Sequence, residues 1–137
     1  MTAPIGGPVP APYKVSWEYA AVFAGGAIGS LAREKITHEL FEAVWTTGTF
    51  TTNTLACFII GWLYAIRHRI HAHIIHLGAV GFCGGLSTFS TLAAELYQVM
   101  QLGDYPGALR SFGLEVTFGI AAALIGEKIG RWGLTAK

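Results

Sequence analysis

Residues 78–92, Gly-Ala-Val-Gly-Phe-Cys-Gly-Gly-Leu-Ser-Thr-Phe-Ser-Thr-Leu, place a glycine pair and four hydroxyl side chains inside an apolar stretch of membrane-spanning length. A backbone group left unpaired in hydrocarbon costs several kcal/mol. A helix break at Gly84-Gly85 is therefore stable at mid-membrane depth only where protein, water or an ion satisfies the freed carbonyls. We interpret this segment as an ion site or as part of a transport pathway.

The composition of this 137-residue chain is that of a membrane protein. Hydrophobic residues make up 53% of it, charged residues only 12%, and the mean hydropathy is +0.50, which is more apolar than a soluble domain of this length. The 18 glycines suit close helix packing in lipid. A formal charge of +1 argues against a nucleic-acid partner. Cys57 and Cys83 lie in apolar runs and are expected to be buried thiols.

The apolar stretches predict an all-α membrane protein with four crossings and no soluble domain. The expected spans are residues 17–36, 45–66, 72–101 and 109–129, the third being interrupted at Gly84-Gly85. Interfacial aromatic residues are expected at Trp17, Trp45, Tyr64 and Trp132. We divide the chain into a flexible N-terminal tail (1–16), a single four-helix transmembrane domain (17–131) and a C-terminal tail (132–137).

Four crossings would place both termini on one side of the membrane, with a small charge bias between the sides. The terminal side carries six basic residues, Lys14, Arg67, Arg69, Lys128, Arg131 and Lys137, and the other side carries three, Arg33, Lys35 and Arg110. This excess weakly favours termini in the cytoplasm. A bias this small also permits insertion in both orientations. We expect a multi-pass protein of the inner or plasma membrane.

Polar side chains inside the second and third spans are the candidate functional residues. Thr49 and Asn53 are four residues apart and share one helical face. Other threonines widen this polar surface: Thr51, Thr52 and Thr54. In one interpretation the threonines bond carbonyls of their own helix and Asn53 joins two helices. In the other, these side chains form a ladder of hydrogen-bond donors that lines a pore.

Three motifs resemble those of the Fluc (CrcB) family of fluoride channels. Residues 25–33, Gly-Gly-Ala-Ile-Gly-Ser-Leu-Ala-Arg, resemble the glycine-rich first helix of the family, which ends in an arginine. Residues 48–58, Gly-Thr-Phe-Thr-Thr-Asn-Thr-Leu-Ala-Cys-Phe, resemble its second-helix motif. Residues 81–91, Gly-Phe-Cys-Gly-Gly-Leu-Ser-Thr-Phe-Ser-Thr, resemble its broken third helix. The order and spacing of the motifs and the chain length all match.

The resemblance implies an antiparallel, dual-topology homodimer with two pores that pass fluoride passively and lower its concentration in the cell. It also implies one buried structural sodium ion, Na+, held by the backbone carbonyls of Gly84 and Ser87 of both subunits. Unwound carbonyls suit such a hard cation. The residues implied for the fluoride pathway are Thr49, Asn53, Phe89, Ser90 and Thr91. Phe89 would present its positive ring edge to the anion, while Arg33 and Glu95 are implied to support the structure or the vestibule.

Three positions depart from the family pattern. Leu92 stands where the family has a second Phe, and the polar positions of the fourth span align with Ser111 and Glu115. An ionised Glu115 would repel an anion in the pathway by about 4 kcal/mol for charges 4 Å apart at an effective dielectric near 20. We therefore expect Glu115 to be protonated, paired with a group such as Arg110 or Arg33, or turned away. These departures leave open a heterodimer with a related chain.

Two other classes of function remain as alternatives. Small dual-topology, proton-coupled exporters also cross four times and use a membrane glutamate, but they carry it in the first span, where this chain has only Glu18 at the edge. A metal-binding membrane protein would use two pairs of histidines, each three residues apart, namely His68 with His71 and His73 with His76. An enzyme is not expected, because no nucleophile, base and orienting residue recur on one accessible face.

Overall fold

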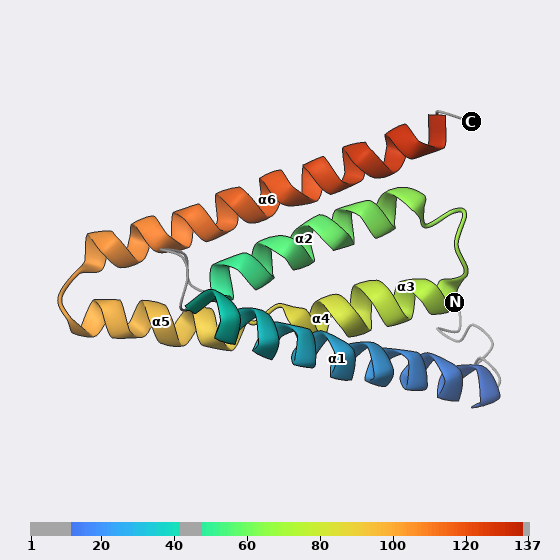
Figure 1. Cartoon of the computed structure of the whole chain (residues 1–137), viewed down its shortest axis with the longest axis horizontal. Coiled ribbons are helices and arrows are strands. Elements are labelled where there is room, and N and C mark those ends of the chain that lie inside the picture. The colour runs from blue at the N-terminus through green and yellow to red at the C-terminus, as the bar shows by residue number, and fades with distance from the viewer. Residues whose placement is uncertain (1–11, 42–47, 136–137) are drawn as a thin grey trace, which may run out of the picture.

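The computed structural model describes residues 12–41 and 48–135, and every regular element within these ranges is a helix (Figure 1). The elements are α1 (Pro12–Phe41), α2 (Gly48–Ile66), α3 (Ala72–Ile75), the π-helix η1 (His76–Phe82), α4 (Cys83–Leu86), α5 (Phe89–Gln101) and α6 (Tyr105–Thr135). Figure 1 shows α1, α2, the run from α3 to α5, and α6 passing back and forth along the molecule. The start of α1 and the end of α6 lie at the same end.

Three of these passes are long and apolar enough to cross a membrane, namely Gly48–Ile66, Ala72–Gln101 and Tyr105–Gly133. They correspond to the second, third and fourth predicted spans, which are confirmed by length and composition. The predicted residues 45–47, including Trp45, lie outside the described residues. In space α2 packs along α6, while α1 packs against η1 and α4. The molecule is therefore two helix pairs joined side by side.

Glycines allow α1 to approach the third pass closely. A Cβ atom on Gly25 would collide with the carbonyl oxygen of Leu77, and one on Gly29 would collide with that of Phe82. A Cβ atom on Gly85 would likewise collide with the carbonyl oxygen of Gly26. The glycine content thus serves close helix packing, as predicted from the composition.

The break in the third pass lies at Ser87-Thr88, and the predicted position at Gly84-Gly85 was wrong. Both glycines are inside α4, and the chain leaves the helix at Ser87 with ψ 156° and at Thr88 with φ −149°. The Thr88 hydroxyl then accepts the N–H of Thr91 at 3.2 Å and caps α5. Gly85 is needed for close contact with α1. Thr88 instead supplies the N-cap with which α5 begins.

The outer helices extend beyond the predicted spans. α1 begins at Pro12, inside the stretch assigned to the N-terminal tail, because proline is well accommodated in the first turn of a helix. α6 begins at Tyr105, after Gly103 turns the chain with φ +81°. The Asp104 carboxylate caps α6 by accepting the Gly107 N–H at 2.9 Å. The domain boundaries at 16/17 and 131/132 therefore fall within continuous helices.

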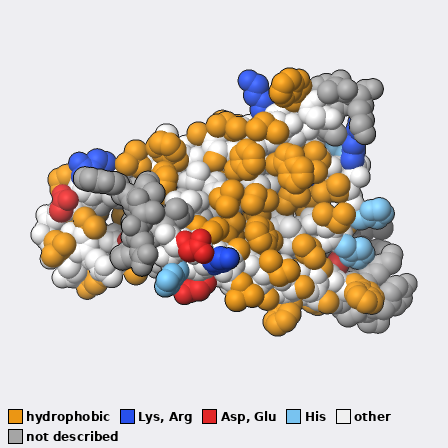
Figure 2. Space-filling model, in the orientation of Figure 1, with side chains coloured by type: hydrophobic (Ala, Val, Ile, Leu, Met, Phe, Trp, Pro, Cys, Tyr) orange, Lys and Arg blue, Asp and Glu red, His pale blue; other side chains and the backbone are white. Residues whose placement is uncertain are grey.

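The outer surface is largely apolar and the buried core is small. Figure 2 shows hydrophobic side chains over most of the middle of one face, with few charged groups among them. The core cluster consists of Ala56, Cys83 and Leu86. Cys83 is buried and Cys57 is half-buried, and both are free thiols. A surface this apolar is typical of helices that face lipid or a partner.

Candidate functional site

Asn53 on α2 holds the broken segment through both polar atoms of its side-chain amide. Its Oδ1 accepts the Thr88 N–H at 2.7 Å, and its Nδ2 donates to the Thr88 carbonyl at 3.3 Å. In a continuous helix the Thr88 N–H would instead bond the carbonyl of Gly84. Asn53 therefore satisfies the backbone of Thr88, and the Gly84 carbonyl loses its helical partner.

Hydroxyl groups gather where α5 begins. The Thr88 hydroxyl oxygen lies 3.2 Å from that of Ser90 and 2.9 Å from that of Thr91. Thr88 is buried, whereas Ser90 and Thr91 are exposed. Phe89, which lies between Thr88 and Ser90 in sequence, has 79% of its surface exposed. The start of α5 thus presents two hydroxyls and an aromatic ring on the outer surface of the chain.

Two glutamates reach this region from different helices. Glu115 on α6 accepts an N–H from Asn53 Nδ2 at 3.4 Å. Glu95 on α5 accepts the hydroxyl of the buried Thr49 at 2.6 Å. Within the described ranges the ion pairs are Lys35–Glu39 and Arg131–Glu127. Glu115 therefore faces Asn53, and no ion pair with Arg33 or Arg110 forms.

Four other residues that the sequence singles out differ in their contacts and in their exposure. Arg33 on α1 donates from Nη1 to the Ser87 carbonyl at 3.3 Å. Thr52 donates to the Gly48 carbonyl of its own helix at 2.9 Å, which is the local bonding expected of membrane threonines. Leu92 is buried, with 8% of its surface exposed. Ser111, near the start of α6, is exposed.

A hollow of about 530 Å³ lies beside the break, between α2, α5 and α6. It brings together four of the predicted pathway residues, Asn53, Phe89, Leu92 and Glu115. Its lining leaves out Thr49, Ser90, Thr91 and Ser111. Sequence reasoning missed Thr88 as a site residue, although a threonine directly before a helix start is the usual sign of an N-cap.

Two carbonyl oxygens at the end of α4 suit a hard cation. The carbonyl of Gly84 has lost its helical partner, and, apart from the adjoining helix residues, no atom of residues 12–41 or 48–135 lies within 4 Å of the place where a Gly84 side chain would begin. The carbonyl of Ser87 accepts one N–H from Arg33 and keeps a second lone pair. Oxygen ligands without a carboxylate suit a monovalent hard ion.

The histidines of the third pass and its preceding turn do not form a metal site. Among the described residues, which include all four histidines proposed as ligands, no group of three potential metal ligands comes together. The His76 ring Nδ1 lies 2.8 Å from the carbonyl oxygen of Ala72 and so bonds its own helix. Within the described residues, the histidine-based metal-binding alternative therefore has no group of three ligands to support it.

The fold and site define a multi-pass helical membrane protein with a polar break in one membrane-spanning pass. The chain matches the family described as CrcB-like protein, Camphor Resistance (CrcB), over residues 20–127. The chain therefore belongs to the CrcB family, as its motifs predict. Proteins similar to this chain are named as ion channels, so the family is one of transporters rather than of enzymes.

Three curated proteins similar to this chain are called fluoride-specific ion channel FluC. The protein from Ruegeria pomeroyi is 54% identical over 113 residues, which cover 82% of this chain and 90% of that protein. The protein from Phocaeicola vulgatus is 34% identical over 116 residues, covering 81% and 93%. The protein from Gloeobacter violaceus is 36% identical over 117 residues, covering 80% and 92%.

Proposed function

We propose that this chain forms a fluoride-selective channel that lowers cytoplasmic fluoride by passive efflux. The observation that carries the proposal is the Asn53 amide, which holds the helix break and donates an N–H toward the hollow shared with Phe89 and Glu115. The similarity to fluoride-specific channels over nine-tenths or more of their length supports the choice of ion.

The proposed pathway follows the hollow between α2, α5 and α6. The Asn53 N–H that now bonds Glu115 is the donor offered to the anion. The exposed ring of Phe89 adds its positive edge, and Leu92 forms an apolar wall. Hydroxyls extend the polar track away from the hollow: Thr49, Ser90, Thr91 and Ser111. A small anion that enters this pathway would replace its bound water with these fixed hydrogen-bond donors.

The proposed functional unit is an antiparallel, dual-topology homodimer in which each chain crosses the membrane four times. The exposed Phe89 ring and the open space beside Gly84 support a partner on this surface. α1 supplies the fourth crossing, since its 30 residues exceed the roughly 20 needed. Its exposed Phe23 and Leu31 suit contact with lipid or with the partner. The nearly balanced basic residues permit both orientations.

The proposed structural Na+ would be held by the Gly84 and Ser87 carbonyls of both subunits. When bound, the ion supplies a positive charge that satisfies oxygens left by the helix break. Arg33 would steady the Ser87 carbonyl through its hydrogen bond. Dialysis of the purified protein against sodium-free buffer should then lower fluoride flux slowly, and sodium should restore flux. Unchanged flux after prolonged dialysis would remove the ion from the proposal.

Growth of a bacterium that lacks its own fluoride exporters tests the proposed function in cells. Expression of this chain alone should restore growth in millimolar fluoride, and the Asn53→Asp variant at equal abundance should not. Failure of the wild-type chain alone, with rescue when a related chain is added, would replace the homodimer by a heterodimer. Resistance to organic cations without resistance to fluoride would support the exporter alternative.

A further inference from the structure

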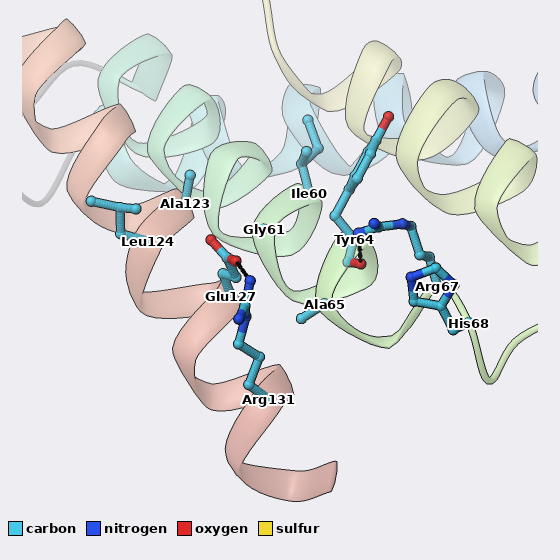
Figure 3. Close-up of a pocket in the computed structure, with 10 residues that line it drawn as sticks. All are labelled: Ile60, Gly61, Tyr64, Ala65, Arg67, His68, Ala123, Leu124, Glu127 and Arg131. Atoms are coloured by element: carbon cyan, nitrogen blue, oxygen red, sulfur yellow. Dashed lines mark hydrogen bonds and ion pairs between the residues drawn. The ribbon is translucent and has the colours of Figure 1, made fainter.

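A second hollow, of about 750 Å³, opens between the last turns of α2 and the C-terminal part of α6 (Figure 3). Its inner wall is apolar and includes Ile60, Ala123 and Leu124. Polar and charged residues line the remainder: Tyr64, Arg67, His68, Glu127 and Arg131. Figure 3 shows Glu127 and Arg131 on the α6 side and Tyr64, Arg67 and His68 on the α2 side.

Two interactions with Tyr64 hold Arg67 in place and leave most of its N–H donors unused. Its Nη1 donates to the Tyr64 carbonyl at 2.9 Å, and its guanidinium lies 5.8 Å from the centre of the Tyr64 ring. An arginine has five N–H donors, of which this bond uses one. In the described part of the chain Arg67 forms no ion pair, whereas Arg131 pairs with Glu127. Two arginines and one glutamate leave this hollow with one net positive charge when His68 is neutral.

Aromatic residues of the kind found at the membrane surface lie near the charged part of the second hollow. Exposed aromatic side chains surround this end of the molecule: Trp62, Tyr64 and Trp132. Such residues favour the membrane–water interface. A smaller hollow of about 380 Å³ adjoins the second hollow at Tyr64, Arg67 and His68, and extends to Ile70 and Ile75 at the start of the third pass. Two partly apolar hollows therefore meet at one arginine.

We propose that these two hollows bind one anionic phospholipid, with its phosphate on Arg67 and one acyl chain in each hollow. A guanidinium donates two parallel hydrogen bonds to a phosphate. Basic pockets between helices at the membrane surface favour anionic headgroups. A zwitterionic lipid carries the same phosphate but brings a cation toward a site that is already positive. The site is separate from the Asn53 hollow, so lipid binding and fluoride conduction can fail independently.

Native mass spectrometry of the purified full chain tests this proposal. The detergent-solubilised protein is mixed with equal amounts of phosphatidylglycerol and phosphatidylcholine that carry the same acyl chains, and the retained lipid is counted. We expect phosphatidylglycerol to be retained about fivefold more, because one arginine near an anionic surface contributes about 1 kcal/mol. The Arg67→Gln variant should lose this preference while keeping wild-type fluoride flux.

Arg110→Gln is the matched control, because it removes an exposed arginine near the start of α6, far along that helix from the second hollow. It should keep the lipid preference. If Arg67→Gln does not fold, Arg67→Met serves in its place, since it keeps an apolar stem beside Tyr64 and carries no charge. Equal retention of both lipids by the wild type, an unchanged preference in the folded Arg67 variant, or displacement of phosphatidylglycerol by millimolar inorganic phosphate would each overturn the proposal.

Discussion

Asn53 on α2 and Glu115 on α6 are joined by a hydrogen bond of 3.4 Å from Nδ2 to Oε2, beside the helix break. The other bond from Nδ2 goes to the Thr88 carbonyl, so the amide donors of Asn53 are divided between the backbone and the carboxylate. An anion that accepts an N–H from Asn53 takes the place that the carboxylate now holds. In the proposed pathway, Glu115 would therefore compete with the anion for this N–H donor.

Replacing Glu115 with Gln should increase fluoride flux by roughly tenfold. The substitution removes a negative charge whose repulsion of a nearby anion is of order 4 kcal/mol. Relief of about 1.4 kcal/mol of that repulsion is enough to change flux tenfold. Flux is measured with a fluoride electrode on liposomes that contain the purified chain. Glu127→Gln, which removes a carboxylate on the same helix beside Arg131, should leave flux unchanged.

The same carboxylate predicts that flux depends on pH. Protonation of Glu115 removes its charge, so flux through the protein should rise as the pH falls, and this rise should be absent in Glu115→Gln. Neutral HF also crosses lipid faster in acid, so the leak of protein-free liposomes is subtracted at each pH. A flat corrected profile, with Glu115→Gln equal to wild type, would place Glu115 off the pathway.

Asn53→Asp should reduce fluoride flux to the level of protein-free liposomes. Aspartate has nearly the same shape, but when ionised it has no N–H for the Thr88 carbonyl or for an anion, and it adds charge opposite Glu115. Size-exclusion chromatography should still show the assembled protein. Gln98→Glu makes the matching change on the exposed part of α5 and should conduct normally. Normal flux in Asn53→Asp would limit Asn53 to joining helices.

Leu92→Phe should raise fluoride flux or change its apparent affinity for fluoride. Leu92 is buried, yet it lines the hollow beside the break, so a larger ring can extend into that space. Its positive edge would then stabilise a dehydrated anion, while overpacking would cost about 1–3 kcal/mol of stability. Leu92→Met, which keeps the volume without a ring, is the control. If the Phe and Met variants conduct alike, Leu92 lies outside the pathway.

Alanine at Gly84 and at Gly85 should have different consequences. Gly85→Ala places a methyl group against the Gly26 carbonyl and should lower the unfolding temperature, because α1 must move away. Gly84→Ala meets none of the described residues outside its own helix within 4 Å and should keep the fold. In the proposed dimer this methyl group would crowd the partner or the sodium ion, so Gly84→Ala should weaken dimerisation. Equal unfolding temperatures for the two variants would contradict this packing.

The long apolar passes could be predicted from the sequence, because membrane length and hydropathy are properties of a continuous stretch. The break could not be placed to the residue. Gly84 and Gly85 look like helix breakers until their packing partners are known, and Gly85 proves to contact Gly26 on α1. The Asn53–Thr88 contact joins residues 35 positions apart, so it depends on how α2 lies against the third pass. A single sequence contains no direct signal of that arrangement.

The selectivity of efflux from liposomes that contain only this purified chain tests the central claim most directly. Liposomes are loaded with equal concentrations of fluoride and chloride, a potassium ionophore balances the charge, and both anions are followed with ion-selective electrodes. The account predicts rapid release of fluoride with chloride retained at the level of protein-free liposomes. Comparable release of the two anions, or release of neither by folded protein, would contradict it.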